Sequence, residues 1–288
     1  TANSRNTDVY DGTEKTVIGF TSSVNGLTFT GVSASGSGTN AGEYDVIFSG
    51  VTLNETKDAT GNYIITATTN GKLTVNPASV TLTANSDTKE YSGTQQTVEG
   101  FTSSVDGLAF TGVSASGSGT NTGTYDVTFS GVTISETKDN TGNYVVTETT
   151  NGTLTITAAT VGTYGALTIT EDQNGKTAKF DGTSTETINV TSAVSVKSVI
   201  YERTFNVGKA STVMLPFEYK ITGNEGGEFY AFVDVKKEGE NWVATMKPDN
   251  NPLDNTQTLT ANKPYLFLPT AAHITFTIPN EDVSICTD

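Results

Sequence analysis

The chain has 288 residues and a net charge of −15, which repels phosphate backbones and argues against nucleic-acid binding. Its one cysteine, Cys286, excludes an internal disulfide, and its one histidine, His273, excludes most histidine-based metal and triad chemistry within the chain. Only 34% of residues are hydrophobic and none of them form an 18-residue apolar run, so no membrane insertion of this chain is expected.

An internal repeat dominates the first half of the chain. Residues 19–40 recur at 100–121 with only two changes, Asn25 to Asp106 and Thr28 to Ala109, so the offset is 100 − 19 = 81 residues. A period near 80 residues is long enough for a small domain with its own core, whereas solenoids and propellers have shorter periods. We therefore expect two tandem domains, residues 1–77 and 78–158.

Each copy shows the two-residue periodicity of a half-buried strand. Tyr125, Val127 and Phe129 alternate with polar residues, and residues 44–48 repeat the pattern. Asn-Gly pairs at 70–71 and 151–152 predict a closing hairpin in each copy. The segment Ser-Gly-Ser-Gly-Thr-Asn at 35–40 and 116–121 is expected to be a flexible loop.

The two copies differ at their beginning. Thr83-Ala84-Asn85-Ser86 follows an alternating segment, Ala78–Leu82, whereas the matching Thr1-Ala2-Asn3-Ser4 opens the chain. We expect the first copy to lack its opening strand, and a parent protein to carry a segment resembling Ala78–Leu82 before Thr1.

Residues 159–288 contain no repeat and have more apolar strands. The predicted strands lie around Val194–Phe205, Thr212–Phe217, Phe229–Val233, Trp242–Ala244, Tyr265–Leu268 and Ile274–Phe276. Short strands separated by Gly, Asn and Pro turns are typical of a β-sandwich or jelly roll. The whole chain is thus predicted to be all-β, with two small domains followed by a sandwich-like domain. The short connection Asn76-Pro77-Ala78 favours an elongated, semi-rigid array.

Candidate chemistry is sparse. An acid/base pair can be drawn from Glu228, Asp234, Glu238 and Glu240, which leaves a glycosidase open, although solvated surface carboxylates explain them equally. Asp249-Asn250-Asn251 with Asp254 approaches a calcium loop without its spacing. No catalytic residue, metal site or cofactor is predicted.

Two aromatic residues are candidate ligand contacts. Trp242 and Tyr230 can stack on a sugar ring if they are exposed on the sheet; the alternative is that both lie in the core of the third domain. The tyrosines Tyr10, Tyr91, Tyr63 and Tyr144 are expected to pack and to fix loops rather than to bind a ligand.

Four short motifs occur in the same order in both copies. In the second copy they are Lys89–Thr94, Gly123–Val127, Gly142-Asn143-Tyr144 and Gly152–Ile156, and in the first they are Tyr10–Thr13, Gly42–Val46, Gly61-Asn62-Tyr63 and Gly71–Val75. Residues 1–158 thereby resemble the tandem MBG/YDG-type repeats of bacterial surface adhesins. The resemblance implies extracellular, non-catalytic modules with an Ig-like or β-grasp-like topology.

Residues 159–288 resemble a domain of surface proteins of gut Bacteroidetes, through segments such as Thr212–Phe217 and Leu259–Pro269. Together the two resemblances imply an exported, non-enzymatic adhesion or stalk fragment that is monomeric and binds an unidentified surface protein or glycan. The alternative function is a carbohydrate-binding module of a glycan-utilisation protein.

Overall fold

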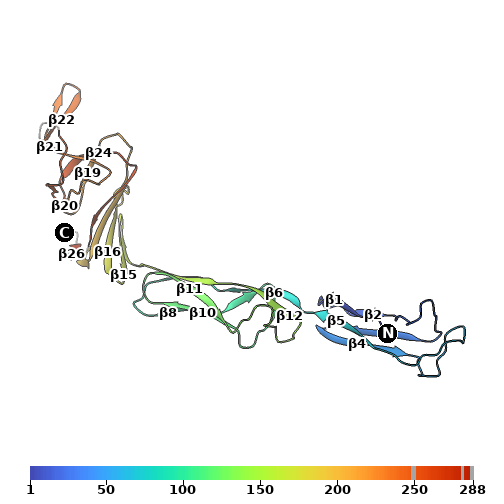
Figure 1. The fold of residues 1–288 in the computed structure, drawn as a ribbon. Coiled ribbons are helices and arrows are strands. Elements are labelled where there is room, and N and C mark those ends of the chain that lie inside the picture. Colours follow the sequence, from blue (N-terminus) through green and yellow to red (C-terminus); the bar gives the residue numbers. More distant parts are fainter. Residues whose placement is uncertain (248–250, 280–281, 286–288) are drawn as a thin grey trace. The chain divides into compact units, whose positions relative to one another are not determined.

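The computed structural model describes residues 1–247, 251–279 and 282–285, and in these residues every regular element is a strand (Figure 1). The chain is therefore all-β, as its composition predicts. Contacts group it into two compact units: residues 1–87, 96–118 and 124–154 form one, and residues 88–95, 119–123 and 155–288 form the other. The domain boundaries expected after residues 77 and 158 stay a prediction.

The first copy forms one five-stranded sheet in the order β1-β5-β4-β3-β2. Its strands are β1 Arg5–Val9, β2 Lys15–Ile18, β3 Ser33–Gly38, β4 Gly42–Ser49 and β5 Gly71–Asn76. The pairing is antiparallel except that β1 runs parallel to β5.

The second copy repeats this sheet in the order β7-β13-β11-β10-β8 and adds a three-stranded sheet, β12-β6-β9. The strands are β6 Ala78–Ala84, β7 Asp87–Glu90, β8 Gln96–Glu99, β9 Phe101–Ser103, β10 Ser114–Gly119, β11 Gly123–Ser130, β12 Tyr144–Thr150 and β13 Gly152–Thr157. The repeated sequence thus specifies the same five-stranded order twice, and only the second copy has the three-stranded sheet.

The alternation in β4 and β11 places one face of each strand in a core. Val46 and Val127 are fully buried, while Asp45 and Asp126 are exposed. In the first copy Val46 packs in a cluster with Ala2, Val17, Ala34, Leu73 and Val75. The predicted period-two strands are therefore confirmed.

The predicted Asn-Gly hairpins are wrong. Gly152 begins β13, which pairs with β7 and β11, whereas β12 pairs with β6 and β9, so the chain passes from one sheet to the other at Asn151. Neither Gly71 nor Gly152 has a positive φ. A Cβ at these positions would overlap the backbone carbonyl of Asn3 or Asn85, so glycine is required by close backbone approach rather than by a turn.

The predicted flexible loop at residues 35–40 and 116–121 is also wrong over most of its length, because β3 and β10 run through it. A Cβ at Gly36 would overlap the carbonyl of Asp45, and one at Gly38 would overlap the ring of Tyr44. These glycines let neighbouring strands approach closely, which composition alone reads as flexibility.

One inserted residue separates the first copy from the second at its beginning. Residues 1–4 match residues 83–86 at an offset of 82, whereas the offset is 81 from Tyr10 onward. The structure places a register shift between Arg5 and Asp8, where β1 pairs with β5. A β-bulge absorbs the extra residue without disturbing the rest of the sheet.

The third segment contains a five-stranded sheet, β14-β15-β16-β18-β25, a four-stranded sheet, β19-β24-β21-β22, and two strand pairs, β17-β26 and β20-β23. The strands are β14 Ala159–Tyr164, β15 Leu167–Asp172, β16 Gly175–Asp181, β17 Val194–Val196, β18 Ser198–Thr204, β19 Ser211–Met214, β20 Tyr219–Lys220, β21 Gly227–Glu238, β22 Asn241–Lys247, β23 Thr258–Leu259, β24 Pro264–Pro269, β25 His273–Ile278 and β26 Val283–Ile285. Strands lie in all six segments predicted from the sequence.

Aromatic side chains join the two larger sheets of this segment in one core. Phe276 of β25 lies 5.5 Å from Phe229 of β21 and 5.8 Å from Phe267 of β24, measured between ring centroids. All three side chains are almost completely buried. Two sheets that share a core across their inner faces have the layered packing expected of a sandwich-like domain.

Candidate functional site

Tyr230 lies on β21 and is half-buried, on the opposite side of the strand from the buried Phe229. Its hydroxyl donates a hydrogen bond of 2.8 Å to Oε2 of Glu228, and this bond raises the pKa of Tyr230. Tyr230 is therefore outside the core, and part of its ring is accessible to a ligand.

Trp242 begins β22, where its backbone pairs with Lys237 of β21; its side chain lies outside the described part of the structure. Lys237 is seven residues from Tyr230 along β21, which corresponds to roughly 23 Å of extended strand. The structure does not bring the backbones of the two predicted ligand residues together, so they do not form one continuous aromatic platform.

The candidate carboxylates are dispersed over the surface of β21 and the turn that follows it. Glu228 accepts the hydrogen bond from Tyr230, Glu238 forms a 3.1 Å ion pair with Lys236, and Asp234 and Glu240 are exposed. Asp249, Asn250 and Cys286 lie outside the described residues. Asp254 accepts hydrogen bonds from the backbone and hydroxyl of Thr256, which lower its pKa and fix a turn. Within residues 1–247, 251–279 and 282–285, no three His, Cys, Asp or Glu side chains are grouped to hold a metal ion.

A polar hollow of about 520 Å³ lies over β16, β18 and β25 and was not predicted from the sequence. The residues that line it are Lys179, Asp181, Thr183, Glu202, Arg203, Thr204, His273, Ile274 and Thr275. Lys179 forms a 2.7 Å ion pair with Glu202, and Arg203 donates to the carbonyl of Thr212 at 2.7 Å. Nδ1 of His273 is 3.2 Å from the hydroxyl of Thr204. These contacts already engage the strongest hydrogen-bonding groups of the hollow.

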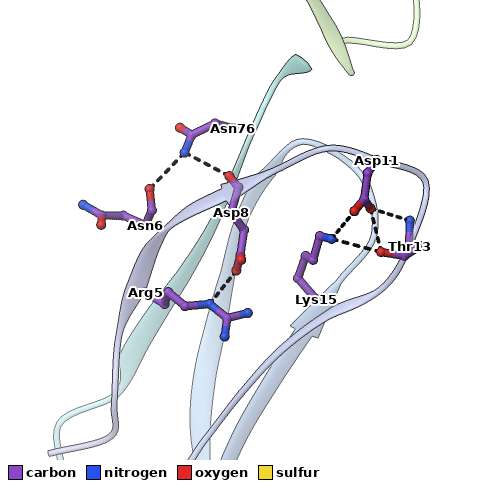
Figure 2. Close-up of polar contacts among 7 residues, drawn as sticks. All are labelled: Arg5, Asn6, Asp8, Asp11, Thr13, Lys15 and Asn76. Atoms are coloured by element: carbon purple, nitrogen blue, oxygen red, sulfur yellow. Dashed lines mark hydrogen bonds and ion pairs between the residues drawn. The ribbon is translucent and has the colours of Figure 1, made fainter. Parts of the chain in front are cut away.

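The Tyr-Asp-Gly-Thr motif of the first copy is a stapled turn (Figure 2). Asp11 accepts hydrogen bonds from Nζ of Lys15 at 2.6 Å and from the hydroxyl and backbone amide of Thr13 at 2.6 and 2.9 Å. The lysine contact and the threonine bonds hold the pKa of Asp11 well below its usual range. In the second copy Ser92 takes the place of Asp11 and lies 3.0 Å from the hydroxyl of Thr94. The motif therefore closes the turn in both copies.

Neighbouring polar side chains in Figure 2 stabilise strand pairing. Nδ2 of Asn76 donates to the carbonyls of Asn6 at 2.9 Å and Asp8 at 3.0 Å, which ties β5 to β1 at the bulge. Nε of Arg5 lies 2.6 Å from the carboxylate of Asp8. All these contacts are internal to the first copy and account for its polar groups by folding.

A buried aspartate organises a second turn in each copy. Asp58 and Asp139 are each only 5% exposed. Asp139 accepts from the hydroxyl and amide of Thr141 at 2.6 and 3.0 Å and from the amide of Tyr144 at 2.9 Å; Asp58 makes the same three contacts with Thr60 and Tyr63. The bonds from Thr60 and Tyr63 lower the pKa of Asp58 to about 2. Burial favours a higher pKa at Asp139, but its hydrogen bonds outweigh burial and the pKa is lowered.

The tyrosines named from the sequence divide into two kinds. The amides of Tyr10 and Tyr91 donate to the carbonyls of Asn76 and Thr157, both at 2.8 Å, so they anchor the stapled turn. Tyr144 packs on a core cluster, as predicted, whereas its counterpart Tyr63 is 48% exposed. Sequence identity at these two positions conceals a difference in environment between the copies.

Comparison of the chain with models of known protein families gives no match, and comparison with curated proteins gives none either. Among the described residues there is no helix long and apolar enough to cross a membrane.

Proposed function

We propose that the chain is a non-enzymatic fragment of a bacterial cell-surface adhesion or stalk protein, located outside the cell. The observation that carries this proposal is the repeated five-stranded sheet, in which two consecutive copies keep the same strand order. Consecutive copies of one small module add reach or avidity, whereas an enzyme gains little from duplicating such a module beside itself.

The use of charged and polar side chains in the copies supports this proposal. Asp11, Asp58 and Asp139 all accept hydrogen bonds from neighbouring turn residues, so these carboxylates serve local folding. The resemblance to MBG/YDG-type repeats points to the same class of protein. Its partner is proposed to be a surface protein or a glycan.

The test uses the full chain immobilised on beads. We expect the beads to adhere to host or bacterial cells or to a glycan array, soluble chain to compete with them, and polysaccharides incubated with the chain to release no new reducing ends. Release of reducing ends above a heat-denatured control would contradict the non-enzymatic proposal. Absence of adhesion to all three surfaces would restrict the chain to a spacer.

A carbohydrate-binding module in residues 159–288 is the second candidate, and the accessible ring of Tyr230 beside the carboxylate of Glu228 favours it. Sugar recognition combines a flat aromatic surface with nearby hydrogen-bond acceptors. In this case Tyr230→Ala and Trp242→Ala should each weaken glycan-array binding at least tenfold, with Met214→Ala, an exposed apolar position on β19, as the control.

A further inference from the structure

The second copy shows what covers one apolar surface of this module. Strand β6 lies between β12 and β9, pairing parallel with the first and antiparallel with the second. Its Val80 and Leu82 are 1% and 0% exposed and form a core with Val146. The side chains packed around them are Phe101, Val105, Leu108, Phe110, Val113, Phe129, Val132 and Tyr144.

In the first copy, the counterparts of these side chains surround an open groove of about 430 Å³. They lie 81 residues earlier, and the groove is lined by Phe20, Val24, Leu27, Phe29, Phe48 and Tyr63 together with residues 64–69. Tyr63 and Ile64 are 48% and 46% exposed, and Ile65 is half-buried where its counterpart Val146 is fully buried. The groove is therefore an apolar core surface without its central strand.

The backbone beside the groove already has the shape of the acceptor. The amide of Asn54 donates to the carbonyl of Ile65 at 2.7 Å, as Ser135 does to Val146 at 2.7 Å. The amide of Ile65 donates to the carbonyl of Thr56 at 3.0 Å, as Val146 does to Thr137 at 2.8 Å. Residues 66–68 make no hydrogen bond within the described part of the chain, so their amides and carbonyls form an unpaired edge.

The far end of the groove fixes the length of the strand that fits. Thr1 and Ala2 take the places of Thr83 and Ala84: Thr1 and Thr21 exchange backbone hydrogen bonds of 2.9 Å, and Ala2 bridges to Phe20 as Ala84 pairs with Phe101. The groove beyond them corresponds to Ala78–Leu82, a segment with Val80 and Leu82 on one face and Ser and Thr on the other.

We propose that this groove is a strand-acceptor site that binds an extended segment of another polypeptide, with aliphatic side chains at alternate positions. The bound segment lies parallel to residues 63–69, as Ala78–Leu82 lies against β12. Its backbone pairs with the edge at residues 66–68, and its two aliphatic side chains fill the places of Val80 and Leu82. Main-chain pairing supplies affinity and the alternating apolar positions supply specificity, as in other additions of a peptide to a sheet edge.

The experiment titrates the full chain with a labelled peptide of residues 76–82, Asn-Pro-Ala-Ser-Val-Thr-Leu, and follows fluorescence anisotropy and backbone hydrogen exchange. We expect saturable one-to-one binding and slower exchange at residues 66–68. A peptide with V80D and L82D should bind at least tenfold more weakly, because charged side chains do not enter the apolar groove.

Matched protein variants locate the binding site. Ala67→Trp adds bulk at an exposed alanine that lines the groove and should abolish binding, whereas Ala59→Trp adds the same bulk at an exposed alanine of the same copy outside the groove and should leave binding unchanged. Thermal melts check that both variants fold. The proposal is overturned if the peptide does not saturate, if the charged peptide binds equally, or if A67W binds as well as A59W. It is also overturned if light scattering shows that a second copy of the chain fills the groove.

Discussion

At the scale of single residues, the most informative side chains are the two buried aspartates. Asp58 and Asp139 each hold three donors from a five-residue turn, and the turn in turn fixes the tyrosine that follows. A carboxylate in this position replaces water with backbone and hydroxyl donors. Its role is therefore to hold the chain where it enters residues 63–69 or β12.

Replacing Asp139 should destabilise the second copy. Asp139→Ala leaves the amides of Thr141 and Tyr144 without their acceptor, which costs about 1–3 kcal/mol of unfolding free energy. Urea denaturation followed by circular dichroism measures this change. The control is Asp106→Asn, an exposed position where the first copy naturally has Asn25, and it should be near neutral. Equal stability of D139A and D106N would remove the structural role of Asp139.

The lowered pKa values of these aspartates predict acid sensitivity. In the unfolded chain an aspartate titrates near its ordinary pKa of about 4, whereas the folded pKa of Asp58 is about 2. The unfolded state therefore binds protons more tightly, so this stabilisation is complete above about pH 5 and is lost as the pH falls toward 2. Melting temperatures between pH 2 and 7 should fall at the acid end, and the double variant D58N/D139N should show a shallower fall.

At the scale of elements, glycine has two different roles that the sequence does not distinguish. Gly107 has a φ of 78° with open space around it, whereas Gly152 has no positive φ and lies against the carbonyl of Asn85. Asparagine tolerates positive φ but has a Cβ. Gly107→Asn should therefore change stability little, and Gly152→Asn should lower it by about 1–3 kcal/mol or more through overpacking. Chemical denaturation of both variants tests this, and a neutral G152N would restore the hairpin interpretation.

This difference explains how far the sequence could be interpreted. The alternation of Tyr44, Val46 and Phe48 has one physical explanation, a half-buried strand, and was predicted correctly. Asn151-Gly152 has two explanations, and choosing between them requires knowing that Asn85 lies against residue 152. The polar hollow over β16, β18 and β25 was missed for the same reason, since its residues come from distant parts of the sequence.

At the scale of the whole molecule, near-identical sequences have unequal cores. The first copy has one buried cluster and an open groove, whereas the second copy also buries Val80, Leu82 and Val146. The aliphatic side chains of Val80 and Leu82 each contribute about 1.5–3 kcal/mol when fully buried. The second copy should therefore be the more stable of the two.

Hydrogen exchange with mass spectrometry tests this expectation on the intact chain. Amides of residues 63–69 should exchange faster than those of 144–150, and the 19–40 segment faster than 100–121, whose peptides differ in mass through Asn25 and Asp106. Equal protection of the two copies would show that the open groove costs no stability.

The likeness of the two acceptor surfaces also affects how the chain reaches its native state. While the polypeptide is still unfolded, Ala78–Ala84 meets two nearly equivalent docking partners, residues 63–69 and residues 144–150, and the wrong one lies closer along the chain. Early capture by residues 63–69 would trap an intermediate that must dissociate before the correct sheet closes, a hazard of tandem copies. Sequence divergence between neighbouring modules would relieve this competition, and here the copies have kept it.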